Sequence, residues 1–142
     1  MEAALLPELY VSDIAKTKSF YMNTLGFSMM YERPENKFLR VERQGSEFMF
    51  VEYNPENKTQ WILAPLEYPY GRGISFQMDT ANVDELYQKV QASGATIYLP
   101  MEEEWYRADD VYLGCRQFIV QDPDGYLLRF AEDLGTRDHA PS

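Results

Sequence analysis

Residues 11–27 read VSDIAKTKSFYMNTLGF, and this stretch decides the fold because it holds a strand end, a helix start and a helix stop. Ser12 and Asp13 offer side-chain oxygens for a helix N-cap, where such groups accept hydrogen bonds from free backbone N–H groups. We therefore predict a helix over 14–24 that ends at Gly26, because glycine tolerates the left-handed C-cap conformation. An apolar strand at 5–11 precedes the helix. Turn-like segments divide the residues after the helix into three further strands, at 27–32, 37–42 and 47–53.

The same order recurs in the second half of the chain. After a strand at 74–78, Asn82 and Glu85 form a capping-box pattern, and a helix over 83–93 ends at Gly94. Three more strands follow at 96–99, 116–121 and 126–131, the last two joined by the turn Asp122-Pro123-Asp124-Gly125. The sequence thus predicts an α+β fold in one domain, 1–142, with two βαβββ modules at 5–53 and 72–133, a linker at 54–71 and a polar tail at 134–142.

Acidic residues dominate the charge, with 23 Asp and Glu against 13 Lys and Arg and a net charge of −10. Nucleic acid is not an expected partner, because phosphate binding needs clustered basic residues. The acidic field either attracts a cationic ligand or simply maintains solubility. No apolar stretch approaches the roughly 20 residues of a membrane span, and the N-terminus lacks a basic signal start, so we expect a cytoplasmic protein without a membrane partner. The only cysteine, Cys115, excludes an intrachain disulfide and is expected to be a buried structural thiol.

Side chains alternate between the two faces of a strand, so each predicted strand has a helix-covered face and an open face. We assign the more uniformly apolar sets to the helix side: Leu9, Val11, Met49, Val51, Ile74, Phe76, Met78, Leu128 and Phe130. The open faces then carry Leu6, Glu8, Tyr10, Phe48, Phe50, Glu52, Gly73, Ser75, Gln77, Leu127, Arg129 and Ala131. If these faces curl toward each other, they form a concave site with apolar walls and a few polar anchors.

Three groups of motifs resemble the vicinal oxygen chelate superfamily, which includes glyoxalase and bleomycin-resistance proteins. They are Val11-Ser12-Asp13 with Ser19-Phe20-Tyr21 and Leu25-Gly26-Phe27, then Gly73-Ile74-Ser75-Phe76-Gln77-Met78-Asp79, and finally Asp122-Pro123-Asp124-Gly125-Tyr126-Leu127-Leu128-Arg129-Phe130. The resemblance covers about residues 5–132 and implies a cup-shaped mixed sheet of two βαβββ modules with helices on its outer face. Enzymes of this superfamily hold a divalent metal on the open faces with His, His and Glu. Its bleomycin-resistance members lack the metal and bind a cationic drug in grooves formed by a dimer.

The metal positions that the resemblance implies hold no ordinary metal ligand here. The two His, the Glu and a fourth ligand fall at or near Leu6, Gly73, Arg129 and Phe50. We therefore expect no metal and no other cofactor. The single histidine, His139, lies in the tail and is expected to be solvated. Glu8 and Glu52 either hold a weak divalent ion, pair with Arg129 or Arg116, or receive a basic group of a ligand.

The family resemblance and the residues on the open strand faces together predict a small-molecule binding protein, similar to the bleomycin-resistance proteins, that sequesters a cationic or aromatic ligand. Drug resistance is one use of such a site. Arg129 would orient a polar or anionic group or neutralise Glu8 or Glu52, and Phe118 is expected opposite Arg129 across the last hairpin. Aromatic residues form the walls, unless they pack in the core or at an interface. The predicted ligand-binding set is Leu6, Glu8, Phe48, Phe50, Glu52, Trp61, Gly73, Ser75, Trp105, Tyr106, Phe118 and Arg129.

Two other classes of function remain open from the sequence. A lyase, isomerase or dioxygenase of the same fold would need a bound metal or a metal-free acid–base pair, with Glu8 as the base if it faces the cavity. A structural or regulatory interaction protein would instead have a filled cup without a pocket. A homodimer is expected in every case, because a two-module chain leaves sheet edges and an open cup that a twofold partner can cover.

Overall fold

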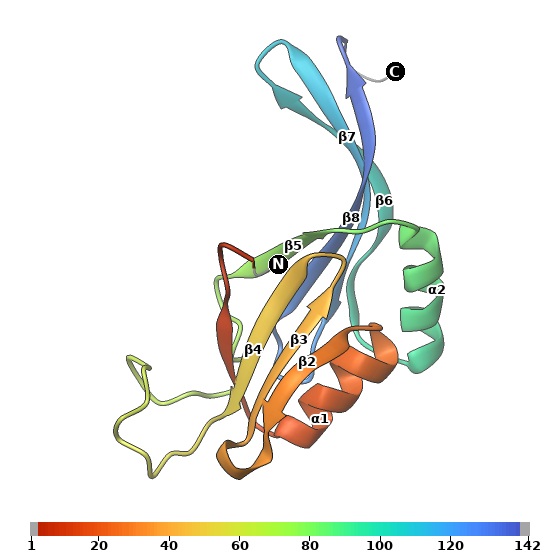
Figure 1. Cartoon of the computed structure of the whole chain (residues 1–142). Helices are drawn as coiled ribbons and strands as arrows, with labels where there is room; N and C mark the ends of the chain where they lie inside the picture. Colours follow the sequence, from red (N-terminus) through yellow and green to blue (C-terminus); the bar gives the residue numbers. More distant parts are fainter. Residues whose placement is uncertain (1–2, 140–142) are drawn as a thin grey trace. The chain divides into compact units, whose positions relative to one another are not determined.

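The chain forms two compact units, each with four strands and an α-helix (Figure 1). The computed structural model describes residues 3–139. The first unit comprises Met1–Gly73 with Asp122–Tyr126, and the second comprises Ile74–Gln121 with Leu127–Ser142. Each follows the order strand, helix, three strands, so the predicted α+β fold of two βαβββ modules is confirmed. No helix among residues 3–139 has the length and apolar character to span a membrane.

The first unit is a mixed sheet in the order β1-β4-β3-β2, in which only β1 and β4 run parallel. Its elements are β1 (Glu8–Val11), α1 (Ile14–Ser19), a π-helical turn (Phe20–Thr24), β2 (Ser28–Arg33), a 3-10 turn (Pro34–Asn36), β3 (Phe38–Arg43) and β4 (Ser46–Glu52). Helix α1 begins where the sequence predicts, because the Asp13 carboxylate accepts hydrogen bonds from Ala15 N at 3.0 Å and Lys16 N at 3.2 Å.

An aromatic cluster around Tyr21 forms the core between the helix and the sheet of the first unit. Tyr21 lies on the π-helical turn and is fully buried. Its ring centroid lies 4.4 Å from that of Phe50, 5.4 Å from that of Phe27 and 6.1 Å from that of Phe48. Tilted and edge-on contacts at these distances stabilise aromatic pairs beyond simple burial, so the cluster anchors the helix on the sheet.

The open-face positions predicted for Phe48 and Phe50 are therefore wrong. The parallel pairing of β1 with β4 places Leu9 beside Phe50, and both side chains face the helix. Met49 and Val51 consequently lie on the open face. Because all four residues of 48–51 are apolar, strand alternation alone does not reveal which pair faces the helix.

The last hairpin turn, Asp122–Tyr126, belongs to the core of the first unit, although both flanking strands belong to the second. Tyr21 Oη donates a hydrogen bond to Asp122 Oδ2 at 2.7 Å. The turn also packs closely on the end of the linker, because a Cβ atom on Gly71 would lie only 2.6 Å from the Cα of Tyr126. Glycine is therefore required at this approach.

The second unit is a mixed sheet in the order β5-β8-β7-β6, in which only β5 and β8 run parallel. Its elements are β5 (Ser75–Asp79), α2 (Val83–Ser93), β6 (Ile97–Ala108), β7 (Val111–Gln121) and β8 (Leu127–Arg137). Gly94 ends α2 in the left-handed conformation, with φ 78°, as the sequence predicts. The core under α2 is formed by Val83, Leu86, Val90, Phe118, Val120, Leu128 and Phe130.

A glutamate from the last strand of each unit caps that unit's helix. Ile14 N donates to Glu52 Oε2 at 3.0 Å, and Val83 N donates to Glu132 Oε1 at 2.8 Å. Asn82 adopts a left-handed conformation and makes no side-chain cap, so the predicted capping box is not formed. The carboxylates also oppose the positive end of each helix dipole, which strengthens the cap.

Strands β6, β7 and β8 are longer than the sequence predicts and continue past helix α2 (Figure 1). The extension includes residues 134–137, which were assigned to the tail. Trp105 packs flat on Gly114, where any side chain would collide with the indole, and the guanidinium of Arg137 lies 3.9 Å from the Trp105 ring centroid. Because α2 covers only part of these strands, the extension has no alternation of apolar and polar residues to mark it.

Candidate ligand-binding groove

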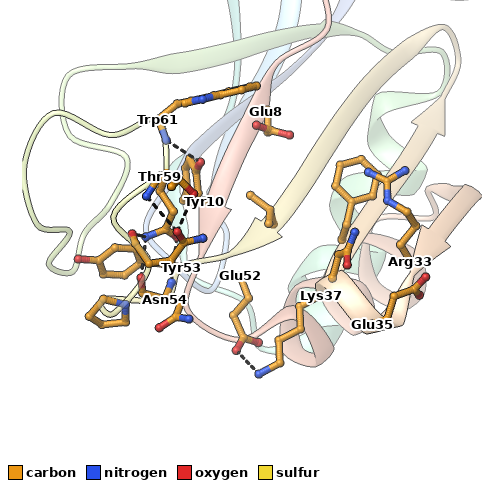
Figure 2. A pocket seen from close by; sticks show the side chains of 16 residues that line it. Glu8, Tyr10, Arg33, Glu35, Lys37, Glu52, Tyr53, Asn54, Thr59 and Trp61 are labelled. Atoms are coloured by element: carbon orange, nitrogen blue, oxygen red, sulfur yellow. Dashed lines mark hydrogen bonds and ion pairs between the residues drawn. The ribbon is translucent and has the colours of Figure 1, made fainter.

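The open face of the first sheet carries a groove with a volume of about 740 Å³ (Figure 2). Pockets for small organic molecules span roughly 300–1,000 Å³. Tyr10, Val51 and Phe38 lie next to one another across β1, β4 and β3 and form the apolar floor. The groove is therefore large enough for a drug-sized molecule and offers it a partly aromatic surface.

A loop after β4 forms one wall of the groove and is held by the side chain of Gln60. The amide of Gln60 accepts a hydrogen bond from Asn54 N at 3.0 Å and donates to Asn54 O at 2.6 Å and Asn57 O at 2.9 Å. The next residue, Trp61, donates its backbone N–H to Tyr10 Oη at 3.1 Å, while its side chain is 85% exposed. The loop thus presents an indole at the rim of the groove.

Two carboxylates of the groove, those of Glu35 and Glu8, make no hydrogen bond or ion pair within residues 3–139. Of the two, Glu8 lies on the same strand face as Tyr10. Glu52, by contrast, caps α1 and pairs with Lys37 at 3.0 Å. The alternative pairing with Arg116 is not formed, because Arg116 binds an aspartate of α2, Asp84, at 2.7 Å.

A buried ion pair lies on the same sheet face as the groove. Arg40 Nη2 contacts Glu47 Oε1 at 2.6 Å, and Ala3 N donates to Glu47 Oε2 at 2.8 Å. The hydrogen bond from Arg40, assisted by that from Ala3, lowers the pKa of the Glu47 carboxyl. A hydrogen bond from Arg40 also lowers the pKa of the Tyr31 phenol. Since both charges of the pair are satisfied by each other, we interpret it as a structural element of the sheet.

The second unit brings only some of its predicted site residues together. Arg129 and Tyr106 share the open face, with Arg129 Nη2 donating to Tyr106 Oη at 3.4 Å. Ser75 is exposed on β5, two residues before Gln77, which pairs with Arg129 in register. Trp105 precedes Tyr106 on β6 and therefore points to the opposite face, so these two rings do not share a wall.

The sequence predicted Phe118 opposite Arg129, but Phe118 lies in the core of the second unit. The β7–β8 ladder pairs Phe118 with Phe130 and Ile119 with Arg129. The connection between the paired strands has five residues, Asp122–Tyr126, instead of the four of the expected turn. The extra residue shifts the register by one and moves Phe118 to the helix side.

Several residues that line the groove were not predicted from the sequence. Leu6 and Gly73, which were predicted, do not line it. Leu6 precedes β1 and is half-buried, and Gly73 is exposed at the end of the first unit with φ 83°. The Asn and Pro residues at 54–57 indicated a turn, but they did not indicate that the side chain of Gln60 would hold that turn in place. The groove residues outside the predicted set include Arg33, Lys37, Phe38, Val51, Asn54 and Gln60.

The residues at the implied metal positions do not fit a divalent cation. Leu6 and Gly73 offer no donor side chain, Phe50 is buried in the core, and Arg129 is itself a cation. Within residues 3–139, no three His, Cys, Asp or Glu side chains gather as a potential metal site. His139 is exposed and lies 3.3 Å from the carboxylate of the preceding residue.

Comparisons with known proteins give one family and several similar structures. The family profile described as Glyoxalase/Bleomycin resistance protein/Dioxygenase superfamily matches residues 4–130. A glyoxalase/bleomycin resistance protein/dioxygenase superfamily member from Vibrio splendidus 12B01 is 38% identical, over 89% of this chain and 95% of its own, with a TM-score of 0.42. No curated protein matches the chain.

Two further solved structures share the fold over nearly the whole chain. A protein of unknown function from Agrobacterium tumefaciens str. C58 is 27% identical, over 94% of this chain and 96% of its own, with a TM-score of 0.72. TioX from Micromonospora sp. ML1 is 19% identical, over 94% of this chain and 99% of its own, with a TM-score of 0.67.

Proposed function

Since this chain belongs to the glyoxalase/bleomycin resistance protein/dioxygenase superfamily, we propose that it binds an organic small molecule with a positive charge and a flat ring, and sequesters it without metal chemistry. One observation carries the proposal. In the groove of the first unit, the carboxylate of Glu8, which has no partner within residues 3–139, lies on the same side as the aromatic rings of Tyr10 and Trp61 (Figure 2).

The part of the groove around Glu8, Tyr10 and Trp61 favours a cation over an anion, whereas Arg33 and Lys37 line another part of it (Figure 2). A carboxylate without a protein partner gains a charge-assisted hydrogen bond when an ammonium or amidinium group approaches, at a smaller desolvation cost than a buried carboxylate. The faces of Tyr10 and Trp61 attract the same positive charge through their π-electrons and stack against a flat ring. The net charge of −10 adds a long-range attraction for cations.

Fluorescence of Trp61 tests the proposal directly. The chain has two tryptophans, so Trp105→Phe leaves Trp61 as the single emitting indole. In this background we expect ethidium, a flat cation, to quench the emission with saturation, and anthraquinone-2-sulfonate, a flat anion without a carboxylate, to bind at least tenfold more weakly. Glu8→Gln is expected to weaken ethidium binding about tenfold, which corresponds to roughly 1.4 kcal/mol.

Glu85→Gln provides the matched control, because it removes one exposed carboxylate from helix α2 of the other unit. It is expected to leave the dissociation constant of ethidium unchanged. Equal losses of ethidium affinity in the Glu8 and Glu85 variants would show that only the net charge of the protein matters, and would contradict a site at Glu8. Equal binding of ethidium and anthraquinone-2-sulfonate would contradict the preference for a cation.

A further inference from the structure

Arg129 on the open face of the second unit is held by uncharged side chains. Its Nε donates to Gln117 Oε1 at 2.6 Å and its Nη2 donates to Tyr106 Oη at 3.4 Å. The guanidinium carbon lies 5.6 Å from the centroid of the Tyr106 ring. No carboxylate of residues 3–139 forms an ion pair with Arg129, so its positive charge is positioned but not neutralised.

Gln117 fixes this arrangement from beneath. Its side chain is almost completely buried, with 2% exposure, and its amide uses both ends. The Nε2 group donates to Tyr106 Oη at 2.7 Å and to Glu102 Oε1 at 3.3 Å, while Oε1 also accepts from the half-buried thiol of Cys115 at 3.3 Å. Because reversing the amide would place its NH2 group against the Arg129 Nε–H and its oxygen against the Glu102 carboxylate, its oxygen stays directed at Arg129.

The hydrogen bonds of Arg129 to oxygen atoms leave one edge of its guanidinium for a ligand. Gln117 and Tyr106 occupy the edge formed by Nε and Nη2, and the guanidinium also contacts the Cys115 thiol, whereas Nη1 donates to no oxygen of the described residues. The edge formed by Nη1 and Nη2 matches the two oxygens of a carboxylate and binds them with two parallel hydrogen bonds. Tyr106, which is 45% exposed, adds a ring face beside this edge.

We infer that Arg129, Gln117 and Tyr106 form a second binding site, specific for the carboxylate of a planar aromatic acid. Arg129 binds the carboxylate, Gln117 positions the guanidinium, and Tyr106 contacts the ring of the ligand. This site lies in the second unit and selects the opposite charge from the groove of the first unit. It is therefore independent of the function proposed for Glu8.

Benzoate serves as the probe, and benzamide serves as its uncharged equivalent. In ¹⁵N–¹H spectra of the full chain, we expect benzoate to shift the Nε–H signal of Arg129 with saturation, and benzamide to leave it in place. Arg129→Gln should weaken benzoate binding at least tenfold. Arg137→Gln is the matched control, because Arg137 also lies on β8 over an aromatic ring but on Trp105, and it should leave binding unchanged.

Two variants separate charge from contact. Gln117→Glu places a carboxylate where the amide oxygen now lies, 2.6 Å from Arg129 Nε, and should abolish benzoate binding by neutralising the arginine. Tyr106→Phe retains the ring, loses the hydroxyl contact and should weaken binding severalfold. If Gln117→Glu does not fold, Arg129→Gln alone decides the question, because Arg129 is only half-buried.

Three results would overturn the site: unchanged benzoate affinity in Arg129→Gln, equal binding of benzamide and benzoate, or inorganic phosphate displacing benzoate at equal concentration. The last result would mark a general anion contact rather than a site for aromatic acids. Glu8→Gln should leave benzoate binding unchanged. A failure of the ethidium experiment therefore does not affect this inference, and the reverse also holds.

Discussion

Replacing Phe50 with alanine is expected to lower the free energy of unfolding by about 3–5 kcal/mol, the usual cost of removing a buried aromatic ring. The side chain is 0% exposed, and its ring centroid lies 4.4 Å from that of Tyr21 and 5.8 Å from that of Phe48. The cavity left by the substitution would lie between helix and sheet, where the surrounding rings cannot close it without moving the helix. Urea unfolding followed by circular dichroism measures the loss.

Met49→Ala is the matched control, because Met49 is adjacent to Phe50 on β4 and faces the open side. It is only half-buried, so we expect a loss of about 1 kcal/mol, near the average for single substitutions. Equal losses for the two variants would contradict the assignment of Phe50 to the core and Met49 to the open face. The comparison therefore tests the face assignment that strand alternation misplaced.

A second large effect is expected from Asp122, a buried residue that is only 4% exposed. Burial raises its pKa to about 6, although hydrogen bonds from Tyr21 Oη, Tyr126 N and Asp124 N favour the ionised form. An unfolded aspartate has a pKa of about 3.9, so between about pH 4 and pH 6 the folded chain keeps a proton that the unfolded chain has lost. Stability should therefore fall as the pH rises through this window, by about 3 kcal/mol from this group, and level off above it.

Asp122→Asn should abolish this part of the pH dependence. An asparagine amide can still accept from the backbone N–H groups through Oδ1, and it carries no charge to desolvate. Urea midpoints measured at pH 4, 5, 6 and 7 would show a decline in the native chain and a flatter profile in the variant. Asp110→Asn, at an exposed position, should retain the native profile. A variant that keeps the full decline would rule out Asp122 as its source.

The sequence was most informative about helix limits, because these depend on interactions between residues that are close together in the chain. Asp13 and the glycines at 26 and 94 set the helix limits through interactions with near neighbours, and all three act as predicted at those limits. The carboxylates of Glu52 and Glu132 cap the same helices from strands far along the chain, and no local pattern indicates them. Strand register likewise depends on pairing, which is why Phe48, Phe50 and Phe118 were misplaced.

The candidate groove was predictable only in part, for the same reason. Glu8 and Glu52 were included because of their strand faces and Trp61 because of its aromatic ring in the linker, and all three line the groove. Its loop wall depends on the amide of Gln60, whose partners Asn54 and Asn57 become apparent only once the loop has folded. The role of Gln117 in positioning Arg129 was not predicted, because a single neutral amide forms no recognisable sequence pattern.

The placement of the turn at 122–126 has a consequence for how the chain is made and inherited. A ribosome that has translated only residues 1–73 has not yet supplied the carboxylate of Asp122, so the buried hydroxyl of Tyr21 gains its acceptor only after the second half of the chain has been made. A gene split after Gly73 would yield a half whose buried hydroxyl lacks its acceptor. The two halves of the chain are therefore not interchangeable copies, because the second half supplies a turn that completes the core of the first unit.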